Sequence, residues 1–96
     1  MKRADLALIV TMVPDAGVGE AIANTLVSSR VAACVNIIGS ATSCYRWEGK
    51  LQKDSEALLL VKTRTQLASR VQEIIEDNHP YELPEVIVLP ITGGSE

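Results

Sequence analysis

The hydrophobic positions along the chain follow a strand-like pattern first and a helix-like pattern next. Residues 6–13 form an almost unbroken apolar run, which predicts a buried strand. Between residues 18 and 26, apolar side chains recur at every fourth position, which predicts an amphipathic helix. Asp15 precedes this helix and is well suited to cap its first turn. The chain is therefore expected to begin with a strand followed by a helix.

A long hairpin is predicted in the middle of the chain. Residues 32–47 favour a strand, and Gly39-Ser40 in their middle predicts a bulge or bend. Glu48-Gly49 is typical of a hairpin turn, and residues 51–62 return as the second strand. Because the strands of an average sheet have only ~5–6 residues, we expect this hairpin to project beyond the sheet.

The C-terminal part of the chain repeats the order of helix and strand. An apolar stripe between residues 67 and 75 predicts a second helix, with Thr63 or Thr65 as its N-cap. His79-Pro80 ends this helix, and residues 86–91 form the last strand. The resulting order, βαββαβ, predicts an α+β, ferredoxin-like sandwich. In this fold, right-handed crossovers place both helices on one face of a single antiparallel sheet.

The second face of this sheet is also expected to be apolar. Residues 37–38, 58–61 and 86–89 are apolar at consecutive positions, whereas a half-exposed sheet would alternate apolar and polar residues. With both helices on one face, the other face would expose several hundred Å² of apolar surface, which is unusual for a monomer. In so small a protein, the expected cover is another copy of the chain.

Composition and charge narrow the classes of function. The length of 96 residues indicates one domain, 1–96, in which residues 93–96 form a loose tail. The net charge is −3 and the basic residues are scattered, so we expect no nucleic-acid partner. No apolar run approaches the ~20 residues of a membrane helix, and the N-terminus lacks a signal-peptide pattern. We therefore expect no membrane association and a cytoplasmic location.

Cys34 and Cys44 are expected to be free thiols. Both lie within one predicted strand, where an extended chain separates them by roughly 30 Å, beyond the reach of a disulfide. Free thiols are typical of a reducing cytosol. Cys34 lies between Ala33 and Val35 and is predicted to be a small core residue. Cys44 lies further out on the hairpin and is expected to be more accessible.

Residues 79–86 form the segment richest in candidate metal ligands. His79 is the only histidine of the chain, and the prolines of the segment stiffen its backbone. A neutral imidazole nitrogen suits copper or zinc, and Glu82 and Glu85 could add oxygen ligands. The alternative is that His79 is a hydrogen-bonded imidazole at the helix end. A closed zinc site needs four protein ligands, so a site here would be completed by solvent or by another subunit.

A second set of candidate residues is expected at a subunit interface or in a cleft. Tyr45 and Trp47 lie two positions apart on one strand, so they point to the same face. Buried aromatic residues often dominate the energetics of an interface. Arg46 points to the other face and, with Lys62 and Arg64, could line a cleft that binds anions. Solvated surface charge is the alternative for these three residues.

Asn36 and Tyr81 complete this second set. Asn36 is a polar residue inside an apolar strand and needs hydrogen-bond partners if it is buried. Tyr81 belongs to the polar segment that contains His79. The sequence has no glycine-rich phosphate loop, Ser-His-Asp arrangement or carboxylate pair of catalytic spacing. We therefore predict no enzymatic activity and no required cofactor.

Three segments carry a family resemblance: AACVNI at residues 32–37, TSCYRWEGK at 42–50 and HPYELPE at 79–85. Together with residues 11–15 and 60–63, they closely resemble the CutA divalent-cation tolerance family, in matching order and spacing from residue 6 to residue 92. The resemblance implies a ferredoxin-like fold, a homotrimer around a three-fold axis and a likeness in shape to PII-type signalling proteins. It also implies tolerance and binding of divalent metals, copper above all.

Two features depart from the family's pattern. Val10 stands where some members have a cysteine that is proposed as a metal ligand beside the residues matching His79 and Glu85. The missing thiol lowers the affinity expected for soft metals. Members also usually continue beyond the glycine pair into a Tyr-Leu-x-Trp segment at the subunit junction, whereas this sequence ends at Glu96.

Three functions follow from these observations. The first is a cytoplasmic homotrimer that binds copper or another divalent cation in metal tolerance. The second is a PII-like signalling trimer that binds a small anionic ligand in clefts between subunits. The third is a trimeric scaffold for protein partners.

Overall fold

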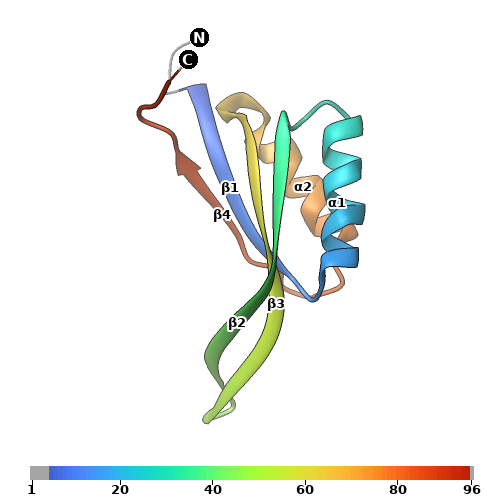
Figure 1. Cartoon of the computed structure of the whole chain (residues 1–96), viewed down its shortest axis with the longest axis vertical. Coiled ribbons are helices and arrows are strands. Elements are labelled where there is room, and N and C mark those ends of the chain that lie inside the picture. The colour runs from blue at the N-terminus through green and yellow to red at the C-terminus, as the bar shows by residue number, and fades with distance from the viewer. Residues whose placement is uncertain (1–4, 96) are drawn as a thin grey trace.

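The computed structural model describes residues 5–95 of the chain. Its elements follow the predicted order and are β1 (Leu6–Val13), α1 (Ala16–Ser28), β2 (Cys34–Trp47), β3 (Lys50–Arg64), the 3₁₀ turn η2 (Thr65–Leu67), α2 (Ala68–Asn78) and β4 (Val86–Pro90). The strands form one antiparallel sheet in the order β2-β3-β1-β4. Both helices lie on the same face of this sheet (Figure 1). The prediction of an α+β, ferredoxin-like fold is confirmed.

The ends of the chain add little to this architecture. Residues 91–95 follow β4 without regular secondary structure. Glu96, at the end of the predicted tail, and residues 1–4 lie outside the described residues. Within residues 5–95, neither helix has the length and apolar character needed to cross a membrane.

The first helix begins where the sequence predicts. The backbone N–H of Val18 donates a hydrogen bond of 2.9 Å to Oδ1 of Asp15, so Asp15 is the N-cap of α1. Gly19 in the same turn is buried, and a Cβ atom at this position would lie 3.0 Å from Cδ2 of Leu59 in β3. A glycine weakens a helix, but here the missing side chain lets α1 approach the sheet closely.

The second helix begins later than the threonines predicted as its cap. Thr63 still belongs to β3, where its buried hydroxyl donates a hydrogen bond of 2.6 Å to the carbonyl oxygen of Val31. Thr65 begins the turn η2, and the N-cap residue of α2 is Leu67. The predicted cap is therefore wrong, because threonine also favours strands and β3 extends further than the sequence pattern indicated.

The β2–β3 hairpin extends well beyond the rest of the sheet, at the bottom of Figure 1. The molecule is 46 Å long on its longest axis, compared with 26 and 21 Å on the other two. The register of the hairpin shifts between Ile38 and Ala41, so Gly39-Ser40 forms the predicted bulge. Both residues of Glu48-Gly49 have positive φ angles, as a tight two-residue turn requires.

The sheet has one face covered by the helices and one face that no helix or strand within residues 5–95 covers, which we call the open face. On the covered face, Ile9, Leu59 and Val61 are fully buried. The alternate residues of each strand lie on the open face, and most are apolar: Leu8, Val10, Met12, Ile38, Leu58, Leu60, Ile87 and Leu89. The prediction that both faces of the strands carry apolar side chains is therefore confirmed.

Cys34 lies on the open face rather than in the core. It is exposed and pairs across the hairpin with Lys62, which is exposed as well. Its prediction as a core residue is wrong, because successive residues of a strand point to opposite faces and the sequence did not reveal which face Cys34 takes. Cys44 is exposed as predicted, and both cysteines are free thiols.

Candidate functional site

A cavity of about 300 Å³ lies where the hairpin meets the segment between α2 and β4, and we call it the hairpin cleft. Its lining comes from β1, from both strands of the hairpin and from the segment itself, and comprises Met12, Ser43, Cys44, Tyr45, Glu56, Tyr81, Leu83 and Glu85. The fold thus brings together three of the predicted candidates, Tyr45, Tyr81 and Glu85, from distant parts of the sequence.

His79 lies beside the cleft as a buried residue with both ring nitrogens bonded to the backbone. Its Nδ1 accepts a hydrogen bond of 3.1 Å from the N–H of Tyr81. Nε2 therefore carries the proton and donates to the carbonyl oxygen of Met12, 2.6 Å away. The imidazole fastens the start of the 79–85 segment to β1. To bind a metal ion, His79 would have to give up one of these hydrogen bonds.

The two glutamates predicted as metal ligands have different surroundings. Glu85 lines the hairpin cleft, and its backbone carbonyl accepts a hydrogen bond of 2.7 Å from the hydroxyl of Thr11. Glu82 is exposed and does not line the cleft. Among residues 5–95 of the single chain, no three His, Cys, Asp or Glu side chains lie close enough together to hold a metal ion. A metal site at this cleft would need donors from solvent or from another subunit.

Two tyrosine–carboxylate pairs form one wall of the cleft region. The hydroxyl of Tyr81 donates a hydrogen bond of 2.7 Å to Oε2 of Glu56. Burial, this hydrogen bond and the nearby carboxylate charges raise the pKa of Tyr81 to about 12. The hydroxyl of Tyr45 donates to Oδ2 of Asp54, and this bond raises the pKa of Tyr45. Both tyrosines therefore stay protonated at neutral pH and hold the carboxylates in place.

The sequence analysis missed Asp54 and Glu56 as partners of these tyrosines. Tyr45 pairs with Gln52 across the hairpin, so Asp54 is its diagonal neighbour on the same face. The Glu48-Gly49 turn sets the register of the hairpin, so the pairing of Tyr45 with Asp54 could have been predicted from the position of that turn. The contact between Glu56 and Tyr81 joins segments that no local pattern relates.

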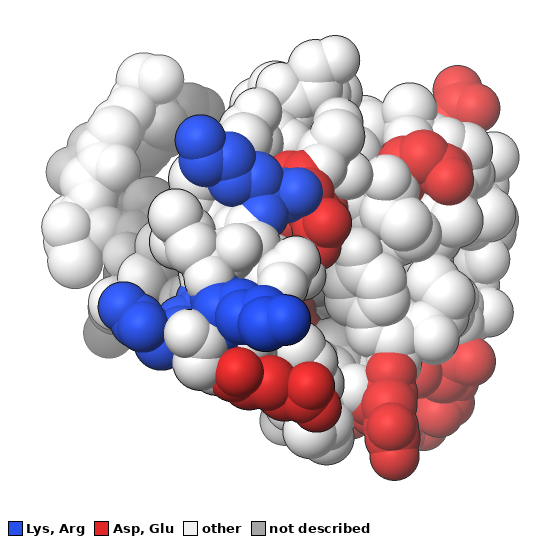
Figure 2. Space-filling model, turned by 90° about the horizontal axis from the view of Figure 1, so that it is seen from below, with Lys and Arg blue, Asp and Glu red and all other residues white. Residues whose placement is uncertain are grey.

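Trp47 and Arg46 lie near the tip of the hairpin. Trp47 is 63% exposed in the single chain and pairs with Lys50 beside the turn. Figure 2 shows the molecule from the hairpin end, where Lys and Arg side chains lie close to Asp and Glu side chains. The charges on this view are mixed in sign, which does not form the continuous basic surface that nucleic acid requires.

Asn36 lies on the open face and is exposed in the single chain, where it pairs with Leu60 of β3. Its side-chain oxygen lies 4.0 Å from the sulfur of Cys34, a weak contact. Asn36 therefore places a polar group on the otherwise apolar open face. Its role as an interface residue stays a prediction.

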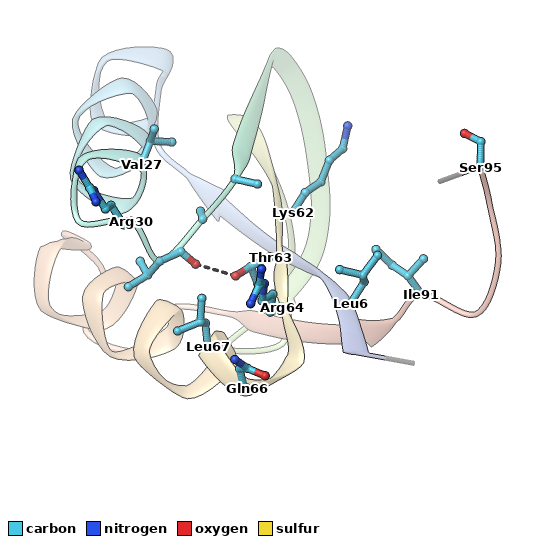
Figure 3. Close-up of a pocket in the computed structure, with 13 residues that line it drawn as sticks. Leu6, Val27, Arg30, Lys62, Thr63, Arg64, Gln66, Leu67, Ile91 and Ser95 are labelled. Carbon is cyan, nitrogen blue, oxygen red and sulfur yellow. Dashed lines mark hydrogen bonds between the residues drawn. The ribbon is translucent and has the colours of Figure 1, made fainter. Parts of the chain in front are cut away.

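A larger cavity, of about 790 Å³, lies at the other end of the sheet, and we call it the end cavity (Figure 3). Lys62 and Arg64 both line it, so these two predicted residues come together. Arg30, from the turn after α1, supplies a third cation that the sequence analysis missed.

Arg46 is not part of the end cavity. It pairs with Leu51 near the hairpin turn, whereas Lys62 lies 11 residues further along β3. At ~3.3 Å per residue, this places the two residues about 36 Å apart along the strand. The prediction that Arg46 shares a cleft with Lys62 and Arg64 is therefore wrong, because the long hairpin carries Arg46 away from the sheet.

Comparison with known proteins identifies the family. The family model described as "CutA1 divalent ion tolerance protein" matches residues 7–96. This chain belongs to the CutA1 family. It is 48% identical over 89 residues to "Protein CutA, chloroplastic" of Arabidopsis thaliana, covering 93% of this chain and 49% of that protein. It is 44% identical over 88 residues to "Divalent-cation tolerance protein CutA" of Thermus thermophilus, covering 92% of this chain and 85% of that one.

Solved CutA1 structures share the fold of this chain. The crystal structure of CutA1 from Oryza sativa superposes with a TM-score of 0.92 at 42% identity, covering 96% of this chain and 84% of that one. The protein from Thermus thermophilus superposes with a TM-score of 0.89 at 43% identity, covering 94% and 87%. The resemblance inferred from the sequence segments is confirmed.

The CutA1 relatives differ in length and in cellular location. The chain spans about half the length of the chloroplastic relatives from Arabidopsis thaliana and Oryza sativa, which it covers to 49% and 50%. A structure from Archaeoglobus fulgidus is described as a periplasmic divalent cation tolerance protein. A cytoplasmic location for this chain therefore stays a prediction.

Proposed function

We propose that this chain forms a homotrimer that binds divalent cations, copper foremost, and contributes to metal tolerance in the cytoplasm without catalysing a reaction. Membership of the CutA1 divalent ion tolerance family supports the role in tolerance. The name of the Thermus thermophilus relative supports it as well. The free thiols of Cys34 and Cys44 support a reducing compartment.

The open face supports the assembly. Eight apolar side chains line it in the single chain: Leu8, Val10, Met12, Ile38, Leu58, Leu60, Ile87 and Leu89. An apolar surface of this kind is rarely left in contact with water. Three copies that turn their open faces toward one axis would bury it, and the projecting hairpins would then reach neighbouring subunits.

The single observation that carries the cation site is the position of Met12. Its side chain belongs to the open face, and the residue also lines the hairpin cleft. A subunit that covers the open face would therefore come close to the cleft. The cleft itself offers a thiol from Cys44 and carboxylates from Glu56 and Glu85, donors that suit copper and other divalent cations. We infer that a neighbouring subunit completes this set.

Within the predicted ligand set, Glu85 is the best-placed residue because it lines the cleft. His79 would join it if Nδ1 released the backbone N–H of Tyr81. Glu82 would reach the cleft only if the backbone of the 79–85 segment changed conformation, so we rank it third among the three candidate ligands.

Native mass spectrometry with and without Cu²⁺ tests this proposal. We expect a mass of three times 10.3 kDa and stoichiometric uptake of copper. Glu85→Gln should lose most of the bound copper, whereas the matched variant Glu82→Gln, three residues away and outside the cleft, should retain it. Nitrogen coupling in the electron paramagnetic resonance spectrum of bound Cu²⁺ would report whether His79 ligates. A monomer, or equal copper uptake by wild type and Glu85→Gln, would overturn the proposal.

A second candidate function is a PII-like signalling trimer that binds a small anion. The observation that favours it is the end cavity, whose lining includes Lys62 and Arg64 from β3 and Arg30 from the turn after α1. The trimeric scaffold for protein partners requires neither ligand. Absence of both copper uptake and anion binding in a stable trimer would favour that third function.

A further inference from the structure

Tyr81 is fixed to the sheet at its backbone and holds a carboxylate of the hairpin with its hydroxyl. Its N–H donates a hydrogen bond of 3.1 Å to Nδ1 of His79, and the two rings lie 4.6 Å apart between their centroids. His79 is in turn bonded to the carbonyl oxygen of Met12 in β1. At the other end of the side chain, the hydroxyl donates a hydrogen bond of 2.7 Å to Oε2 of Glu56 in β3. Tyr81 therefore connects Glu56 to a point that β1 holds in place.

Glu56 lies where β3 passes the hairpin cleft. It precedes Leu58 by two residues, so the alternation of the strand turns its side chain toward the open face, where Leu58 pairs with Met12. Glu56 is partly buried and lines the cleft together with Glu85. Two carboxylates in one small cavity repel each other, and a cation that enters the cavity relieves this repulsion.

The orientation of Glu56 decides whether its carboxylate can serve such a cation. A glutamate side chain rotates about several bonds, and holding it in one orientation costs conformational entropy. In metal sites, the hydrogen-bond partners of ligating carboxylates fix that orientation, and their removal typically lowers metal affinity about 10–100-fold. The Tyr81 hydroxyl bonds one oxygen of Glu56. Because a carboxylate has two oxygens and about four acceptor positions, Glu56 keeps room for an ion.

A second tyrosine of the cleft offers an internal comparison. The hydroxyl of Tyr45 donates to Oδ2 of Asp54, which lies two residues before Glu56 and hence on the same face of β3. Asp54 is exposed and does not line the cleft, whereas Glu56 does. The two tyrosines thus make the same kind of bond to neighbouring carboxylates, but only the bond of Tyr81 orients a carboxylate of the cleft.

We propose that Tyr81 is a positioning residue of the cation site, whose hydroxyl orients Glu56 as the ligand that the hairpin contributes. This inference rests on the proposed cation-binding function and adds to it a ligand and the residue that orients this ligand. The effect belongs to the hydroxyl, because Tyr81→Phe keeps both the backbone N–H and the ring beside His79.

Calorimetric titration of the assembled protein with Cu²⁺ tests the inference in a double-mutant cycle of Tyr81→Phe and Glu56→Gln. Each single variant should lower the copper affinity about tenfold or more. The double variant should bind copper no more weakly than Glu56→Gln alone, because Tyr81 acts through Glu56. If Tyr81 only supported the fold, the two losses of affinity would add. Circular dichroism spectra and melting temperatures show whether each variant is folded at the temperature of the titration.

The matched comparison is Tyr45→Phe, which also removes one tyrosine hydroxyl bonded to a carboxylate of β3. It should lower the copper affinity far less than Tyr81→Phe, because Asp54 lies outside the cleft lining. Equal losses in the two tyrosine variants would overturn the inference, and so would additive losses in the cycle. Wild-type protein that takes up no copper would overturn the cation site and this inference together. Copper uptake by wild type that Tyr81→Phe leaves unchanged would overturn the inference alone.

Discussion

Replacement of Ile87 by lysine tests whether copies of the chain cover the open face. Ile87 pairs with Val10 of β1 on that face and is 42% exposed in the single chain. The next residue, Val88, is 43% exposed but pairs with the buried Ile9, so it points to the other face. Ile87 and Val88 therefore form a matched pair, with nearly equal exposure on one strand and opposite orientations.

The size of the effect follows from burial and charge. Full burial of an isoleucine side chain contributes about 1.5–3 kcal/mol, so covering the exposed 42% of Ile87 contributes about 1 kcal/mol per subunit. A lysine at this position also places an unpaired charge in the interface, which costs several kcal/mol per ion. Three copies of the change should therefore cost the trimer on the order of 10 kcal/mol, about seven powers of ten in the assembly constant.

Light scattering at micromolar concentration measures the result. Wild type and Val88→Lys should give three times 10.3 kDa, because a lysine at position 88 can extend into solvent at the edge of the sheet. Ile87→Lys should give the mass of one chain, with a circular dichroism spectrum that still shows the folded α+β structure. A trimer of unchanged stability in Ile87→Lys would refute the reasoning, and so would equal dissociation of both variants.

Two further predictions concern the cleft and the hairpin tip. The pKa of Tyr81 is raised to about 12 in the folded protein, from an ordinary value of 10.0. The protonated hydroxyl of Tyr81 therefore contributes to the free energy of unfolding in full below pH 10.0, and this contribution is lost as the pH rises through 12. Between these pH values, the free energy of unfolding measured with urea should fall less for Tyr81→Phe than for wild type, because phenylalanine has no hydroxyl to titrate. An equal fall in both proteins would contradict this prediction. Trp47→Ala should weaken the trimer by about 2 kcal/mol or more, measured by dilution, whereas unchanged dissociation would identify Trp47 as a free surface residue.

The parts of the fold that the sequence predicts correctly depend on short stretches of residues. Gly39-Ser40 and Glu48-Gly49 predict the bulge and the turn because each conformation involves only a few neighbouring residues. The orientation of Cys34 was predicted wrongly, because a shift of one residue reverses the face that every strand side chain takes. The cap of α2 was missed for a related reason, since it depends on where β3 ends.

The candidate site is less predictable because its contacts join distant segments. The sequence identifies His79 as the only histidine, but the carbonyl oxygen that accepts the hydrogen bond from its Nε2 belongs to Met12, 67 residues earlier. The bond between Tyr81 and Glu56 likewise spans 25 residues. Arg30 has the positive φ angle that a glycine often adopts just after a helix. The sequence could indicate this position only if the last residue of α1 were already known.

Met12 connects the proposed assembly with the proposed cation site. Its side chain belongs to the open face, its carbonyl oxygen holds the ring of His79, and the residue lines the hairpin cleft. A subunit packed on the open face would therefore contact the side chain of Met12, and the backbone of the same residue positions His79 and the 79–85 segment beside the cleft. If the cleft needs a neighbouring subunit for its ligands, the monomeric Ile87→Lys protein should take up no copper even though Glu85 and Cys44 are intact. Copper bound by that monomer would instead assign the whole site to one chain.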